Sequence, residues 1–105
     1  MLLQDKIAVV TGASRGIGRA TAKALAREGA VVIVNYNGSK ERADEVVSEI
    51  EKDGGKAKAI QCNVSDFEQA KEFFGGVVKE YGRIDILVNN AGITRDNLIM
   101  KMSEE

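Results

Sequence analysis

A glycine-rich stretch near the amino terminus is the clearest candidate for chemistry in this 105-residue sequence. It lies between the apolar run 7–10 and a segment with helical spacing, and its sequence is Thr11-Gly12-Ala13-Ser14-Arg15-Gly16-Ile17-Gly18. Glycines in such a place allow a tight turn, close approach of the backbone to a phosphate, and close contact between helix and strand. The N-terminus of the helix adds N–H groups and partial positive charge for a pyrophosphate. We therefore predict that the loop binds a nucleotide cofactor.

Other kinds of site are excluded by the residues present. A nucleoside-triphosphate P-loop needs Lys and then Ser or Thr after its last glycine, whereas Arg19-Ala20 follow Gly18. The sequence has no histidine and a single cysteine, Cys62, which excludes histidine-based nucleophile pairs, an intrachain disulfide and a multi-cysteine metal site. A net charge of −1 argues against nucleic-acid binding. The lone cysteine and the lack of a secretory or membrane-spanning segment lead us to expect a cytoplasmic protein.

Predicted strands and helices alternate along the chain. Short apolar runs predict buried strands at 7–10, 30–34 and 84–88, while Ala57, Ala59 and the break at Asn63 predict a weaker strand at 56–62. Helical spacing predicts helices at 16–28, after the N-cap Ser39, and after a Ser65–Glu68 capping box. This alternation implies right-handed βαβ crossovers. The predicted fold is therefore α/β and Rossmann-like, a truncated doubly wound parallel sheet of four strands in the order 3-2-1-4.

The apolar positions also predict which face of each helix is buried. For the first helix they are Ile17, Ala20, Thr21, Ala24 and Leu25. For the second they are Ala43, Val46, Val47 and Ile50. For the third they are Phe67, Ala70, Phe74, Val77, Val78 and Tyr81. Gly75-Gly76 stand inside the third helix, and close packing against a neighbour is the only physical reason that we expect for them.

Two motifs carry a resemblance to a known family. The glycine loop resembles the T-G-x-x-x-G-x-G pattern of the short-chain dehydrogenase/reductase family, and Asn89-Asn90-Ala91-Gly92 resembles its N-N-A-G motif. Both follow predicted strands, and the sequence is identified as a member of this family over essentially its whole length. The stretch 92–98 resembles the 3-oxoacyl-[acyl-carrier-protein] reductase branch.

The resemblance implies a dinucleotide site at the carboxyl ends of the strands. Its candidate residues are Gly12, Ala13, Ser14, Arg15, Gly16, Ile17, Gly18, Asn35, Tyr36, Asn37, Asn63, Val64, Asn90, Ala91 and Gly92. Asn63 matches the adenine-contacting position and offers an acceptor oxygen to the adenine amino group. The resemblance also implies that Asn89 has a structural role in the central sheet.

The turn after the second strand predicts NADP(H) rather than NAD(H). An acid there would pair with the ribose 2′-hydroxyl of NAD and repel a 2′-phosphate, but Asn35-Tyr36-Asn37 contains no carboxylate. Arg15 and Lys40 can each pair with a 2′-phosphate, and the alternative is that both are solvated surface charges. On this argument an Asn35→Asp substitution is expected to reverse the preference.

No catalytic residue is predicted in this chain. The family's Tyr-x-x-x-Lys signature is matched by Tyr36 and Lys40, but this match surrounds a glycine turn at the adenosine end of the cofactor, so we expect it to be a decoy. The resemblance implies that the complete enzyme uses NADPH to reduce 3-oxoacyl thioesters of acyl carrier protein in fatty acid biosynthesis. Because the catalytic Ser, Tyr and Lys belong to later segments, we expect the isolated chain to be inactive.

The end of the sequence predicts a fragment that associates with itself. Ser103-Glu104-Glu105 indicates a helix N-cap with nothing after it. The fourth strand would then be an open sheet edge, and a single helix would cover one face, which together predict a homo-oligomer. Two alternatives stay open, a self-sufficient nucleotide-binding module and a self-associating structural fragment.

Overall fold

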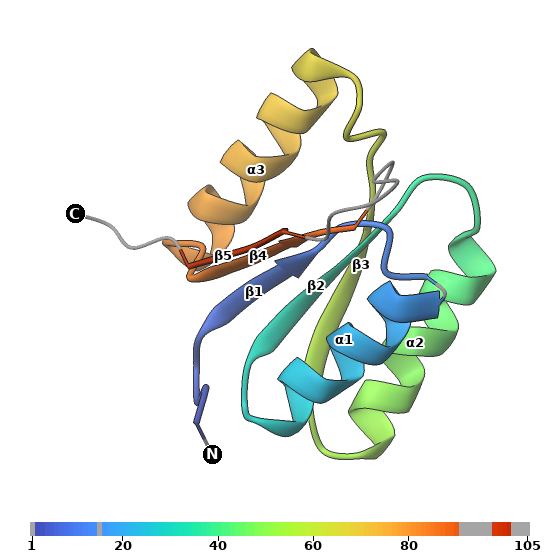
Figure 1. Cartoon of the computed structure of the whole chain (residues 1–105), viewed down its shortest axis with the longest axis vertical. Coiled ribbons are helices and arrows are strands. Elements are labelled where there is room, and N and C mark those ends of the chain that lie inside the picture. The colour runs from blue at the N-terminus through green and yellow to red at the C-terminus, as the bar shows by residue number, and fades with distance from the viewer. Residues whose placement is uncertain (1, 15, 91–97, 102–105) are drawn as a thin grey trace.

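The computed structural model describes residues 2–14, 16–90 and the backbone of 98–101. Helices lie on both faces of a central sheet (Figure 1). In chain order the elements are β1 (Ile7–Val10), α1 (Gly16–Arg27), β2 (Val31–Tyr36), α2 (Lys40–Lys52), β3 (Lys56–Gln61), α3 (Phe67–Tyr81), β4 (Ile86–Asn89) and β5 (Leu98–Lys101). None of the helices within these described residues is long and apolar enough to cross a bilayer.

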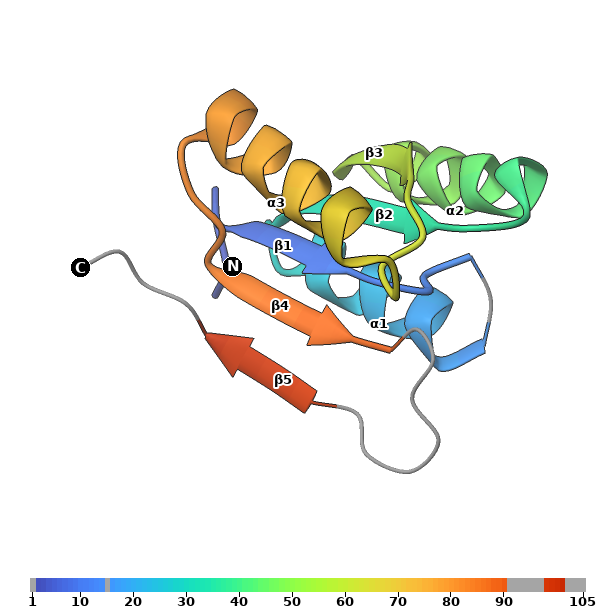
Figure 2. The ribbon, with the colours of Figure 1, turned by 90° about the horizontal axis from the view of Figure 1, so that it is seen from above.

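The sheet has the order β3-β2-β1-β4-β5. Its first four strands are parallel, which confirms the predicted α/β fold and the order 3-2-1-4. The prediction that the fourth strand is an open edge is wrong, because β5 pairs antiparallel with β4, from Ile86↔Lys101 to Asn89↔Leu98. Within the described sheet, the edge strands are therefore β3 and β5 (Figure 2).

Two apolar layers hold the sheet between the helices. Along β1, Ala8 and Val10 belong to the layer under α1 and α2, whereas Ile7 and Val9 belong to the layer under α3. Figure 2 shows α3 on one face of the sheet and α1 and α2 on the other. The strand is buried on both faces, as a continuous apolar run predicts.

The buried face of α2 is as predicted, but that of α1 is not. In α2, Ala43, Val46 and Ile50 are buried, and Ser39 caps the helix by accepting a hydrogen bond from Arg42 N. In α1 the buried residues are Gly18, Ala22 and Ala26, while Ile17 is 65% exposed. The short side chains at four-residue spacing let α1 lie close to the sheet, so size rather than hydrophobicity sets its inner face.

The third helix departs from the prediction in two ways, its N-cap and its buried face. Its N-cap is Asp66, which accepts from Gln69 N, and not Ser65, whose hydroxyl donates to Asn63 Oδ1. Its buried residues are Phe73 and Val77, whereas Phe67 and Val78 are 75% and 45% exposed. The inner face is thus rotated toward Phe73, which lies over β1–β3 together with Cys62.

Close packing does not explain the glycine pair in this helix. A Cβ added at Gly75 or at Gly76 would meet nothing within 4 Å. Both positions face open space, and the reason for two glycines there is not visible in the structure.

Candidate functional site

The three glycines of the loop after β1 have different structural roles. Gly12 (φ 61°) and Gly16 (φ 60°) adopt the left-handed conformation that L side chains rarely adopt. Gly16 borders open space, since a Cβ there would meet nothing within 4 Å. A Cβ on Gly18 would instead lie 2.3 Å from Gly12 O and 2.6 Å from Asn90 Nδ2. Gly18 therefore provides the close contact between α1 and the loop, and Gly16 leaves room for a ligand at the start of the helix.

Thr11 joins this loop to the end of β4. Its hydroxyl donates to Asn89 Oδ1 (3.0 Å) and accepts from Asn90 N (2.8 Å). Thr11 is only 1% exposed, so these bonds form in the interior. The two sequence motifs are thus held together by direct hydrogen bonds, and the structural role expected for Asn89 has a physical basis.

Asn35 supports the loop from the other side. Its Oδ1 accepts from Gly12 N (3.2 Å), and its backbone carbonyl accepts from Ala13 N (3.0 Å). Its Nδ2 donates to the carbonyl oxygens of Ile60 (3.4 Å) and Cys62 (3.2 Å). An aspartate here would face those two carbonyls with a carboxylate that cannot donate. Asn35→Asp is consequently a poor test of cofactor preference, because it would disturb the sheet first.

A cavity of about 290 Å³ opens beside these groups, at the carboxyl ends of β1, β2 and β3. Its lining residues are Gly12, Asn35, Asn37, Cys62, Asn63, Val64 and Ser65. Five of them are predicted site residues, and the structure brings them together from three separate stretches. Cys62 and Ser65 were not predicted, although both are sequence neighbours of the Asn63-Val64 pair, and that adjacency was the available signal.

The other predicted residues are less uniformly placed. Ala13 and Tyr36 are buried beneath the loop and the sheet end, and Ser14 is half-buried. Ile17 extends into solvent from the first turn of α1. Arg15, Ala91 and Gly92 lie outside the described residues.

The acceptor oxygen that we expected to meet adenine already has partners. Asn63 Oδ1 accepts from Ser65 N (3.1 Å) and from Ser65 Oγ (2.7 Å). Asn63 N in turn donates to Gln69 Oε1 (3.1 Å). A carboxamide oxygen has two lone pairs, so the Asn63 group left for a ligand is its Nδ2 donor.

Neither Cys62 nor the Tyr36–Lys40 pair has the arrangement of a catalytic group. Burial, followed by the nearby Asp66 and Glu72 charges, raises the pKa of the Cys62 thiol and disfavours the thiolate. Tyr36 ends β2 while Lys40 begins α2, so they do not share one helix face. Lys40 Nζ donates to Asp44 Oδ2 (2.8 Å), and this bond raises the pKa of the lysine.

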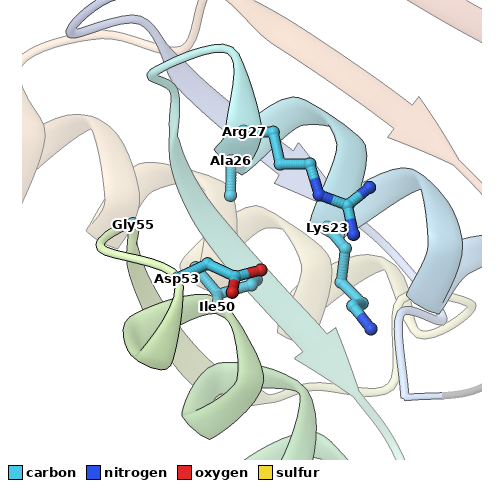
Figure 3. A pocket seen from close by; sticks show the side chains of 6 residues that line it. All are labelled: Lys23, Ala26, Arg27, Ile50, Asp53 and Gly55. Atoms are coloured by element: carbon cyan, nitrogen blue, oxygen red, sulfur yellow. The ribbon is translucent and has the colours of Figure 1, made fainter.

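A second depression lies between the C-terminal turns of α1 and α2. Figure 3 shows its lining residues, which are Lys23, Ala26, Arg27, Ile50, Asp53 and Gly55. It contains charges of both signs and none of the predicted site residues. Among the residues that the structure describes, no group of three or more His, Cys, Asp or Glu side chains could hold a metal ion. The cavity at the carboxyl ends of the strands is therefore the better candidate.

A doubly wound sheet with a glycine loop at the carboxyl end of its first strand defines a Rossmann-like α/β protein. The chain belongs to the short chain dehydrogenase family, whose sequence profile matches residues 6–105. It is 57% identical over 100 residues to the 3-oxoacyl-[acyl-carrier-protein] reductase FabG of Staphylococcus aureus strain Mu50, with 95% of this chain and 41% of that protein covered. It is 52% identical over 103 residues to an uncharacterised oxidoreductase of Methylorubrum extorquens, covering 98% of this chain and 42% of that protein.

Solved structures show the same fold. A metagenomic short-chain oxidoreductase in complex with NADP matches with a TM-score of 0.85 and 42% identity, over 89% of this chain and 42% of that one. A dehydrogenase/reductase from Sinorhizobium meliloti matches with a TM-score of 0.82 and 52% identity, over 87% of this chain and 36% of that one. The chain spans about two fifths of the length of the curated relatives that it matches, for example 41% of the Staphylococcus protein.

Proposed function

We propose that this chain is the NADP(H)-binding part of a reductase. In the complete enzyme, hydride passes from NADPH to a 3-oxoacyl thioester carried on acyl carrier protein, a step of fatty acid biosynthesis. The observation that carries the proposal is the cavity at the carboxyl ends of β1–β3, which joins the glycine loop to Asn37 and Asn63. The reductase named for the Staphylococcus relative and the NADP held by the metagenomic relative support the substrate and the cofactor.

The preference for NADP(H) rests on the charge of the cavity. All of its lining residues are neutral, with no carboxylate to repel a 2′-phosphate. Lys40 is less suited to the phosphate than its sequence position suggests, since its ammonium group already pairs with Asp44 at 2.8 Å. Arg15 stays the sequence's candidate for that pairing.

We expect these 105 residues to bind the cofactor without turning over substrate. Tyr36 and Lys40, the only match to the family's catalytic signature in the sequence, lie in different elements at the cofactor end of the sheet. Oxidation of NADPH by the purified chain in the presence of a 3-oxoacyl thioester would contradict this expectation.

Calorimetric titration of the chain with NADPH, and separately with NADH, tests the cofactor assignment. We expect binding of both, with NADPH the tighter ligand. Arg27→Gln in the second depression is a control that should leave both affinities unchanged, because it lies outside the candidate site. Absence of heat with either nucleotide would refute cofactor binding, and tighter binding of NADH would refute the phosphate argument alone.

A further inference from the structure

Gln61 contacts the residue that borders the cavity at the end of β2. It is the last residue of β3 and pairs in register with Tyr36. Its Nε2 donates to Asn37 O (3.3 Å) and to Asn37 Oδ1 (3.1 Å). Gln61 does not line the cavity, but Asn37 does. The wild-type Gln61 side chain can therefore influence a ligand in this cavity through its hydrogen bonds to Asn37.

The backbone carbonyl fixes the orientation of both amide side chains. A carbonyl oxygen only accepts hydrogen bonds, so the Gln61 group facing Asn37 O must be its amino group. The same amino group faces the Asn37 side chain, which must then present its oxygen to Gln61. The amide group of Asn37 left for a ligand is consequently Nδ2, a donor.

A fixed donor distinguishes the two cofactors. The oxygens of a dianionic 2′-phosphate accept hydrogen bonds, and a bond to a charged acceptor is stronger than one between neutral groups. The 2′-hydroxyl of NADH both donates and accepts, so it pairs with either end of an amide. Holding Asn37 as a donor thus favours the phosphate and brings little gain for the hydroxyl.

We propose that Gln61 is a positioning residue for cofactor specificity, which holds Asn37 as a hydrogen-bond donor toward the 2′-phosphate of NADPH. This inference rests on the proposed function, since it places the adenosine ribose at the end of β2. Gln61 itself touches neither cofactor nor substrate. Its effect should appear in the ratio of the NADPH and NADH affinities.

Two substitutions of Gln61 separate the roles of hydrogen bonding and charge. Gln61→Leu removes the bonds to Asn37 and frees its amide to rotate, so we expect NADPH affinity to fall by about three- to tenfold with little change for NADH. Gln61→Glu offers an acceptor instead, which turns the Asn37 amide around and adds negative charge, so we expect a larger loss for NADPH. Gln4→Glu makes the same charge change at an exposed position before β1, at the end of the sheet opposite the candidate site. It should alter neither affinity.

The experiment is a titration of the wild-type chain and each variant with both cofactors. Asn37→Ala is included because Gln61→Leu should have no further effect on the ratio once Asn37 is removed, whereas independent effects would add. A urea unfolding midpoint for each variant establishes that it is folded. If one of the Gln61 variants does not fold, the affinity ratio is read from the other Gln61 variant and from Asn37→Ala.

The outcomes are distinct. A fall in the ratio of NADPH affinity to NADH affinity in both Gln61 variants, with the effect of Gln61→Leu disappearing in the Asn37→Ala background, supports the proposal. Wild-type preference for NADPH with an unchanged ratio in the Gln61 variants overturns this inference and leaves the proposed function standing. Failure of the wild-type chain to bind NADPH overturns both.

Discussion

Gly18 is the residue at which the loop tolerates least change. An added Cβ would lie 2.3 Å from the backbone oxygen of Gly12, so either α1 or the loop must move. We expect Gly18→Ala to destabilise the fold by about 1–3 kcal/mol, as overpacking typically does, and to weaken NADPH binding as the loop shifts. Urea unfolding and the same calorimetric titration measure the two effects.

Gly75→Ala is the matched control for this substitution. It makes the same chemical change inside a helix, but at a position where the new Cβ meets nothing within 4 Å. Because alanine favours helix over glycine, it should stabilise the chain by about 1 kcal/mol and leave NADPH affinity unchanged. Equal losses of stability in the two variants would contradict the packing role of Gly18.

At the scale of elements, hydrogen bonds of Asp85 join the start of β4 to the start of β1. Its carboxylate Oδ2 accepts from Ile7 N and from Arg83 Nε, each at 2.8 Å, and Asp85 N donates to Ile7 O, also at 2.8 Å. Burial alone would raise the pKa of Asp85, but the Ile7 and Arg83 hydrogen bonds outweigh it and hold the pKa below its usual value. The charged form is therefore the one that joins the two strands.

The lowered pKa gives a pH-dependent contribution to stability. Its full value is present above the pKa of Asp85 in the unfolded chain, and it is lost as the pH falls through the lower pKa of the folded state. Asp85→Asn removes the titrating charge, so we expect the free-energy difference between wild type and variant to be largest near pH 7 and to shrink below about pH 4. Urea unfolding across this range measures it, and a difference independent of pH would contradict the assignment.

The sequence predicts the elements better than it predicts how they pack. Apolar runs predicted β1, β2 and β4, the positions of Ala57 and Ala59 predicted β3, and Ser39 predicted the start of α2. The buried faces of α1 and α3 depend on how closely each helix approaches the sheet, which apolar spacing does not encode. The strand β5 depends on pairing with β4, a long-range contact. The candidate site shows the same contrast. Its loops could be predicted from the sequence, whereas the hydrogen bonds of Asn35 and Asn63 could be seen only in the assembled sheet.

At the scale of the whole molecule, the two faces of the sheet are unequally covered. Among the described helices, α1 and α2 share one face and α3 lies alone on the other (Figure 2). Phe67 and Val78, about three helical turns apart on α3, are 75% and 45% exposed. Exposed apolar groups of this kind favour association, so we expect the chain to self-associate through this helix and not through the paired strand β4.

Sedimentation velocity over a range of concentrations measures this association. The double variant Phe67→Lys/Val78→Lys should sediment as a monomer where the wild type forms larger species. Glu68→Lys, an exposed charge change on the same helix, should behave as the wild type does. A wild-type chain that is monomeric at every concentration would exclude the homo-oligomer.

The supports of the glycine loop also determine when its order is acquired. Asn35 holds Gly12 and Ala13 from β2, and Thr11 holds the end of β4. These bonds form as the sheet assembles, so this part of the loop loses its conformational entropy during folding and not during binding. A nucleotide would then bind to a loop segment that is already ordered. Its association rate would be set by diffusion and orientation instead of by loop closure. The same coupling means that disordering this part of the loop breaks the hydrogen bonds that join it to β2 and to the end of β4.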